Sequence, residues 1–245
     1  MADSGQFTAT LRLTVGELKV VHPIAVPSAA VPATEVVPAL QGLVNAVVAA
    51  AEVGQTISCR KGCGACCRQL VPISRTEGER LLHLIEAMPA KRREALSRRF
   101  AAAEAAIARA NLFSSPPIGE EEKKKMTDRE ASRSDRELSL AYFALRVPCP
   151  FLEDESCSIH AERPLVCREY LVTSPPELCA GPAQEGVTPV AVPKVSPAAR
   201  RLQDDTDGWF PLALLMHWSR SRPRNAERRP GPDWVQRFVR RIAAR

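Results

Sequence analysis

Eight cysteines carry most of the chemistry that this sequence offers, and they stand in two groups far apart along the chain. In the first group, neighbouring cysteines are separated by only two or three residues, so one loop can turn several thiolates toward a single ion. Thiolates bind zinc and also hold iron–sulfur clusters. We therefore expect a metal centre to which both groups contribute. The candidate ligands are Cys59, Cys63, Cys66, Cys67, Cys149, Cys157, Cys167 and Cys179.

Glycines and basic residues surround these cysteines. Gly62 and Gly64 suit a tight chelating loop because glycine reaches unusual backbone angles at little cost. Several thiolates in one place accumulate negative charge, and nearby cations would offset it and lower the thiol pKa values. The cations that we expect to do so are Arg60, Lys61, Arg68, Arg163 and Arg168.

The adjacent pair Cys66-Cys67 limits the arrangement, because two neighbouring residues seldom both reach one small ion. The pair then serves two different metals, or one member is a redox thiol or supports a ligand. Eight cysteines complete two four-coordinate sites, or one cluster plus a reactive group. Inert buried thiols are one alternative, which fits chelate spacing poorly. A disulfide framework is the other, which the expected reducing setting disfavours.

The order of these residues resembles a known family. The first segment reads Cys59-x3-Cys63-x2-Cys66-Cys67, and Cys149-Pro-Phe-Leu follows much later. The second segment continues as Cys157-x-Ile-His160-x2-Arg163-Pro164-x2-Cys167-Arg168-x-Tyr170. Together they resemble the CxxCxxCC family of YkgJ-type cysteine cluster proteins, described as zinc- or iron-chelating, over residues 55–180. The resemblance implies metal chelation and no established substrate. It departs at His160, where many relatives carry tyrosine.

Three residues of the second segment are expected to lie beside the centre as cofactor-supporting residues: Arg163, Arg168 and Tyr170. We expect the arginines to bond backbone carbonyls around the ligands. His160 is either a ligand or a hydrogen-bonding neighbour of one.

The metal is left open between zinc and an iron–sulfur cluster. Four-cysteine sites are typical of structural zinc. A Cys-Pro pair also occurs in bacterial ferredoxin motifs, which Cys149-Pro150 matches in part. The long, two-part arrangement suits a cluster embedded in a helical domain. We therefore slightly favour an iron–sulfur cluster and keep zinc as the alternative.

Two classes of function follow. In the first, the centre serves metal handling, redox chemistry or partner binding. In the second, the chain is an iron–sulfur-dependent enzyme, either an oxidoreductase or an S-adenosylmethionine-using protein N-methylase-like enzyme. The spacing of Cys59, Cys63 and Cys66 is that of radical S-adenosylmethionine enzymes, but Ala65 stands where they usually carry an aromatic residue. A flagellin lysine N-methylase resembles the same cysteine family, which keeps methyl transfer open.

Composition and charge narrow the setting. The chain has 245 residues, 45% of them hydrophobic and 25% charged, with a net charge of +6. Much of the positive charge lies in the C-terminal tail, which we interpret first as a solvated helix end and second as a surface for an acidic protein partner. No nucleic-acid-binding motif accompanies it, so nucleic acid is not expected.

The polar N-terminus gives no sign of a signal peptide. The most apolar stretch, 38–53, is interrupted by Gln41 and Asn45 and falls short of the roughly 20 residues that span a bilayer. We therefore expect a cytoplasmic protein without a membrane segment, in which thiols stay reduced and bind metal.

The sequence patterns on either side of the cysteines predict an α+β fold that is mainly helical. Alternating β-branched residues predict a small N-terminal β-hairpin over 7–26, and apolar periodicity predicts helices over 34–54, 91–111 and 135–148. A capping-box pattern at Thr76 and Glu79 predicts another helix, ending near Pro89. Residues 149–179 are dense in cysteine and proline and predict an irregular metal-binding centre.

We divide the chain into three parts. Residues 1–33 are the hairpin and its connector, residues 34–182 are the cysteine-cluster domain with a mobile linker over 114–133, and residues 183–245 are an extension with a basic helical tail. For one centre to form, the fold must bring 59–67 beside 149–167.

Overall fold

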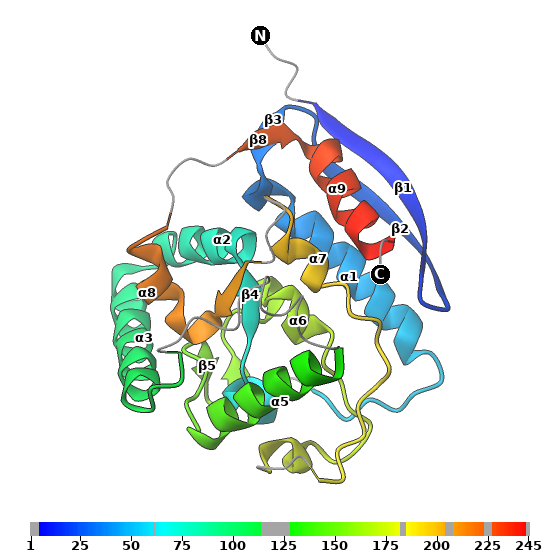
Figure 1. The fold of residues 1–245 in the computed structure, drawn as a ribbon. Coiled ribbons are helices and arrows are strands. Elements are labelled where there is room, and N and C mark those ends of the chain that lie inside the picture. The colour runs from blue at the N-terminus through cyan, green and yellow to red at the C-terminus, as the bar shows by residue number, and fades with distance from the viewer. Residues whose placement is uncertain are drawn as a thin grey trace.

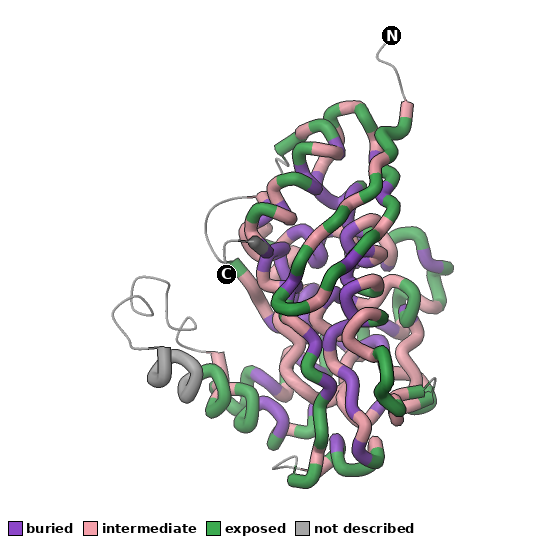
Figure 2. The backbone as a smooth tube through the Cα atoms, turned by 90° about the vertical axis from the view of Figure 1, so that its right-hand side faces the viewer, coloured by how far each residue is buried: buried purple, intermediate pink, exposed green. Residues whose placement is uncertain are grey.

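A computed structural model gives the fold for residues 5–60, 62–113, 128–181, 185–203, 208–222 and 227–243. It is mixed α+β, as predicted, with about half of the chain helical and with strands confined to small two-stranded sheets. Buried segments run through the length of the molecule (Figure 2). The elements pack around three clusters of buried apolar side chains.

The N-terminal hairpin forms where it was predicted. Strands β1 (Gln6–Val15) and β2 (Leu18–Pro27) pair antiparallel, with Val15 opposite Leu18. Gly16 adopts φ +59° in the turn, a left-handed value that glycine reaches without strain. Alternate residues of β2, namely Val20, Ile24 and Val26, are buried, so one face of the ribbon is fixed to the core.

Helix α1 (Val37–Glu52) lies under β2, after the short turn η1 (Ala33–Val36). Its apolar face, with Leu40, Leu43, Val44 and Val47, is completely or almost completely buried. Residues 33–52 are long and apolar enough to span a membrane by length and composition, which differs from our reading of the sequence. Burial in the core accounts for that apolar character.

The C-terminal helix completes this first core (Figure 1). Helix α9 (Gly231–Ala243) buries Trp234 and Phe238 between the hairpin and α7 (Pro197–Arg200). Just before it, β8 (Arg228–Pro230) pairs with β3 (Ala30–Pro32), within what was predicted to be a connector. The predicted basic tail is therefore a helix docked by its apolar face.

A second core joins α2 (Arg75–Glu86) to α3 (Ala90–Arg109) and to the segment with η5 (Leu212–Leu214) and α8 (Leu215–Ser219). Strand β4 (Pro72–Ser74) leads into α2 and pairs with β7 (Trp209–Pro211). The capping box of α2 is Ser74 with Glu77, two residues before the predicted pair, so that prediction was wrong.

Helix α5 (Asp128–Ala144) lies along one side of the cysteine-rich region, where Tyr142 packs in a third apolar cluster with Ile107 of α3. It begins earlier than predicted, because residues 128–134 contain no proline or glycine to stop a helix. Of the predicted linker, 128–133 is therefore helical, and 114–127 lies outside the described residues.

The cysteine-rich region has only short elements, as predicted. In the first segment there is η2 (Ala65–Arg68). The second contains β5 (Leu152–Glu153), β6 (Ser156–Cys157), η3 (His160–Glu162), α6 (Leu165–Arg168) and η4 (Pro176–Ala180). The division of the chain into three parts stays a prediction, and the first core draws residues from each of them.

Candidate metal centre

The two cysteine segments lie side by side and are joined through their backbones. The amide of Cys149 donates to the carbonyl oxygen of Cys67 at 2.7 Å. At the other end of the first segment, the Ser58 amide donates to the Val172 carbonyl at 2.9 Å, and the Ser58 hydroxyl donates to the Thr173 carbonyl at 2.8 Å. The fold therefore brings 59–67 beside the second segment, as one shared centre requires.

The loop of the first segment packs closely on the β5–β6 turn, at a buried glycine. A Cβ on Gly64 would meet the Leu152 side chain at 2.6 Å and the Glu155 carbonyl at 2.9 Å. Only glycine permits that approach. Arg68 then pairs with both carboxylate oxygens of Glu155, at 3.0 and 2.6 Å. These contacts fix the loop that presents Cys66 and Cys67.

The eighth cysteine comes from a third segment. Cys179 is buried within η4, which packs against η2. Arg146, after the end of α5, donates to the carbonyl of Ala180 at 2.5 Å and so stabilises this turn. Cys179 therefore joins the centre by packing, despite its distance from the other cysteines in sequence.

Cys66 influences the pKa values of cysteines in all three segments. A hydrogen bond with the side chain of Cys67 and then burial raise the pKa of Cys66. A charge on Cys66 in turn raises the pKa values of five other thiols, which come from all three segments. These are Cys59, Cys149, Cys157, Cys167 and Cys179.

Burial dominates the electrostatics of these thiols. It raises the pKa of Cys149 to about 12 and the pKa of Cys167 well above its ordinary value. Arg163 lowers the pKa values of Cys59 and Cys157, but by less than burial raises them. The expected lowering of thiol pKa values is therefore confirmed for Arg163, but burial outweighs it, since low-polarity surroundings disfavour the thiolate more strongly.

Arg168 stabilises the second segment through hydrogen bonds of its guanidinium group. Its guanidinium donates to the carbonyls of Arg163, at 3.0 Å, and Ala161, and to the Asn45 side chain of α1 at 3.0 Å. The bonds to backbone carbonyls are those that the sequence analysis expects of an arginine here. His160 is exposed, and its Nε2 lies 2.8 Å from a guanidinium nitrogen of Arg163.

A buried glutamate that the sequence analysis did not single out positions α6, the helical turn that contains Cys167. Glu77 accepts hydrogen bonds from the Ser74 amide at 3.0 Å and the Ser74 hydroxyl at 2.7 Å, and also from the Leu165 amide at 2.8 Å. Burial raises the Glu77 pKa. The signal in the sequence was Ser74-x-x-Glu77, a capping box two residues before the one that we chose.

Several buried polar atoms lie beside the cysteines. The Tyr170 hydroxyl lies within hydrogen-bonding reach of the Gln69 and Cys179 side chains, and Nε of Arg163 is buried without a hydrogen-bond partner among the described residues. Burial raises the Tyr170 pKa, a hydrogen bond with Gln69 lowers it, and the neighbouring Cys179 raises it again. Buried donors need an acceptor, and thiolates or cluster sulfides are acceptors. The surroundings thus fit a metal–thiolate group.

All eight cysteines are described, and all are free thiols rather than disulfides. Seven are partly exposed and Cys179 is buried. In the described part of the chain, no three cysteine, histidine or acidic side chains are grouped as they would be around an ion. Metal binding therefore requires the thiols to turn toward one another within the frame that their backbones provide.

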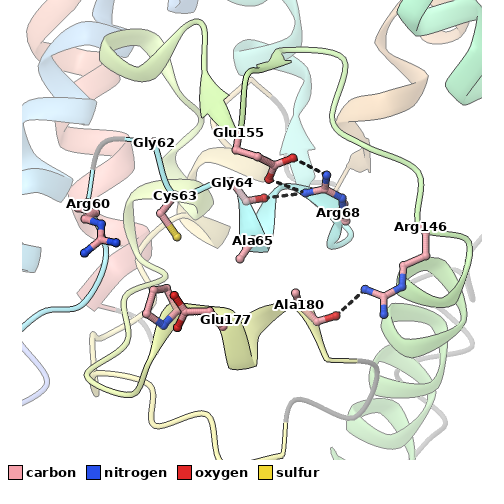
Figure 3. Close-up of a pocket in the computed structure, with 11 residues that line it drawn as sticks. Arg60, Gly62, Cys63, Gly64, Ala65, Arg68, Arg146, Glu155, Glu177 and Ala180 are labelled. Atoms are coloured by element: carbon pink, nitrogen blue, oxygen red, sulfur yellow. Dashed lines mark hydrogen bonds and ion pairs between the residues drawn. The ribbon is translucent and has the colours of Figure 1, made fainter.

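A pocket of about 510 Å³ opens beside the first segment (Figure 3). Cys63 lines it together with Ala65 of η2, and η4 forms the opposite wall. Arg60 and Arg146 stand on opposite sides. The region of the thiols is therefore accessible from solvent on this side.

Comparison with known proteins gives one match. The family model described as "CxxCxxCC: Putative zinc- or iron-chelating domain" matches residues 58–180, which is half of the chain and contains all eight cysteines. No curated protein and no solved structure matches the chain. On the family match, this chain belongs to the CxxCxxCC family of zinc- or iron-chelating cysteine-rich domains.

Proposed function

We propose that the chain holds its metal in one thiolate centre shared by the cysteine segments, and that this centre serves metal handling or electron transfer with a partner. The observation that carries the proposal is the meeting of the three cysteine segments. The Cys149–Cys67 backbone bond holds two of them together, and η4, which contains Cys179, packs against η2, which contains Cys66 and Cys67.

The meeting of all three cysteine segments in one place supports one iron–sulfur cluster over two separate zinc sites. Two independent zinc sites would not need η2 to contact both Cys149 and η4. When bound, a cluster would supply one-electron transfer, whereas zinc would supply a closed structural link. In either case the cysteines are the ligands that we propose, and Arg163, Arg168 and Tyr170 support them from the side of the second segment.

Partial exposure supports a centre that other molecules approach. A purely structural site is closed, with its ligands withdrawn from solvent. Here Cys63 is partly exposed and lines an open pocket, whereas the thiols of Cys149 and Cys167 are buried. A cytoplasmic setting, where thiols stay reduced, and an acidic protein partner for the arginines near the C-terminus belong to the same proposal.

The pocket favours a second candidate, an iron–sulfur-dependent enzyme. Its volume of about 510 Å³ lies in the range of small-molecule sites. An oxidoreductase or an S-adenosylmethionine-using N-methylase-like enzyme would bind its substrate there, next to Cys63. An enzyme needs an open coordination position toward the pocket, whereas a carrier or electron-transfer protein does not.

Anaerobic purification followed by metal analysis and a visible absorption spectrum tests the proposal. Iron and sulfide with a broad band near about 400 nm would support the cluster. Stoichiometric zinc without colour would support metal handling and would exclude electron transfer as the function of the centre. Protein that has all eight thiols free, and that takes up neither metal on anaerobic reconstitution, would contradict the proposal. Turnover of S-adenosylmethionine by the iron-loaded protein would favour the enzyme.

A further inference from the structure

The pocket beside Cys63 has the features of a binding site for a small anion. Three arginines line it, Arg60, Arg68 and Arg146, against two glutamates, Glu155 and Glu177. Arg68 and Glu155 neutralise each other in their two-point ion pair. What remains is two guanidinium groups against the single carboxylate of Glu177, so the pocket is electropositive.

The two remaining arginines keep donors for a ligand. The side chain of Arg60 is exposed and has no hydrogen-bond or ion-pair partner within the residues that the structure describes. Arg146 uses Nη1 to bond the Ala180 carbonyl, and its guanidinium carbon lies 4.7 Å from the centre of the Phe143 ring. The stacking and the single bond orient Arg146 and leave other N–H groups free to pair with a carboxylate.

We propose that this pocket binds a small organic polycarboxylate, with one carboxylate on Arg60 and another on Arg146. The two arginines stand on opposite sides of the hollow, which suits two separated anionic groups better than one compact ion (Figure 3). Carbon-rich walls at Ala65, Pro176 and Ala180 suit an organic skeleton between them. The volume is that of a small-molecule site.

This ligand would lie against Cys63. Carboxylate oxygens bind metal ions, so a polycarboxylate can bring an ion to the Cys63 thiol or receive one from it. That role rests on the proposed function above. Binding of the polycarboxylate does not, because it depends only on the arginines and on the shape of the pocket.

Calorimetric titration of the full chain, as purified, with citrate at low ionic strength tests the inference. We expect saturable binding that Arg60→Gln weakens about tenfold, since a charge-assisted hydrogen bond contributes on that order. Arg12→Gln is the matched control, because Arg12 is an exposed arginine of β1 that does not line the pocket. It should leave citrate binding unchanged.

Glu177→Gln supplies a change of opposite sign. It removes the one unpaired negative charge of the pocket, so citrate should bind more tightly, which general damage to the fold would not produce. The inference is overturned if citrate does not bind, if Arg60→Gln and Arg12→Gln have equal effects, or if inorganic phosphate binds as tightly as citrate. Metal content is measured on the same samples. Protein without metal that still binds citrate through Arg60 would support the pocket while the proposed function fails.

Discussion

The amide of Cys149 donates to the carbonyl oxygen of Cys67 at 2.7 Å, although residues 68–148 lie between them in the chain. This bond uses backbone atoms, so it does not depend on the state of either thiol. Ser58 makes comparable bonds to Val172 and Thr173 at the start of the segment. The frame of the centre is therefore built by the protein, and a metal would add to a frame that already exists.

Metal removal should consequently loosen the centre without unfolding the protein. The first core contains the hairpin, α1 and α9, and its buried residues include none of the cysteines. After strong chelation we expect faster amide hydrogen exchange in 59–68 and 149–180, with protection retained in β2 and α1. Hydrogen–deuterium exchange read by mass spectrometry measures this. Loss of protection throughout the chain would show that the frame depends on the metal.

Cys167→Ser should weaken metal binding about a hundredfold, because removing one of a few thiolate ligands forfeits a large part of the binding free energy. Cys167 is expected to be a ligand because it belongs to the second cysteine segment, within the residues that the zinc- or iron-chelating family model matches. Competition with a coloured chelator measures the affinity. Ser156→Ala, next to the candidate ligand Cys157, is the control and should retain wild-type affinity.

The sequence predicted that the cysteine segments lie side by side. It did not predict which residues hold them in place. Residue type and spacing in 59–67 and 149–167 indicate ligands of one centre, because cysteines seldom gather in this way without a metal. The role of Glu77 was not predictable in the same way. Ser74 with Glu77 and Thr76 with Glu79 both fit a capping box, and the tertiary bond from Glu77 to the Leu165 amide is consistent with the first.

The fold was likewise predictable where local pattern decides it. The hairpin over 7–26 and the helix over 34–54 follow from periodicity that the core retains. The arginines of α9 alone would indicate a solvated end, but Trp234, Phe238 and Ile242 stand at helical spacing and predict a face that docks. Trp234 decides the docking, since the ring is fully buried and its Nε1 donates to the Val31 carbonyl at 2.9 Å. The thiol pKa values depend on burial, which spacing alone does not give.

Glu77→Ala should lower the free energy of unfolding by about 3 kcal/mol, because it leaves the Leu165 amide and the Ser74 cap without their acceptor in a buried place. The same change should weaken metal binding, since Leu165 begins the turn that contains Cys167. Urea denaturation measures the stability. Glu94→Ala is the matched control, because the Glu94 side chain is 72% exposed, and it should change stability little.

Glu104 should make the stability of the fold depend on pH in the acidic range. Its carboxylate lies 2.9 Å from His217 and 2.5 Å from Arg220, and it links α3 to α8. The His217 contact and then Arg220 hold the Glu104 pKa below its ordinary value of 4.5. A lowered pKa in the folded state contributes stability that is present above 4.5 and is lost as the pH falls through the folded value.

Glu104→Gln should therefore be less stable than the wild type at neutral pH, with a small difference because the carboxylate is partly exposed. The difference should shrink as the pH falls below 4.5. Thermal unfolding of both proteins as a function of pH measures it. A difference that stays constant across this range would rule out the ionic link and leave only a packing effect.

Tyr170→Phe isolates the contribution of one hydroxyl to the centre. The hydroxyl is buried beside the Gln69 and Cys179 side chains, so its removal should lower the free energy of unfolding by only about 1 kcal/mol. If it donates to a thiolate or a cluster sulfide, metal affinity should fall by about tenfold or more, as is typical for a group that supports a ligand. Metal competition and urea denaturation on the same variant separate these effects. Equal losses in stability and affinity would assign Tyr170 to the fold, and unchanged affinity would remove it from the centre.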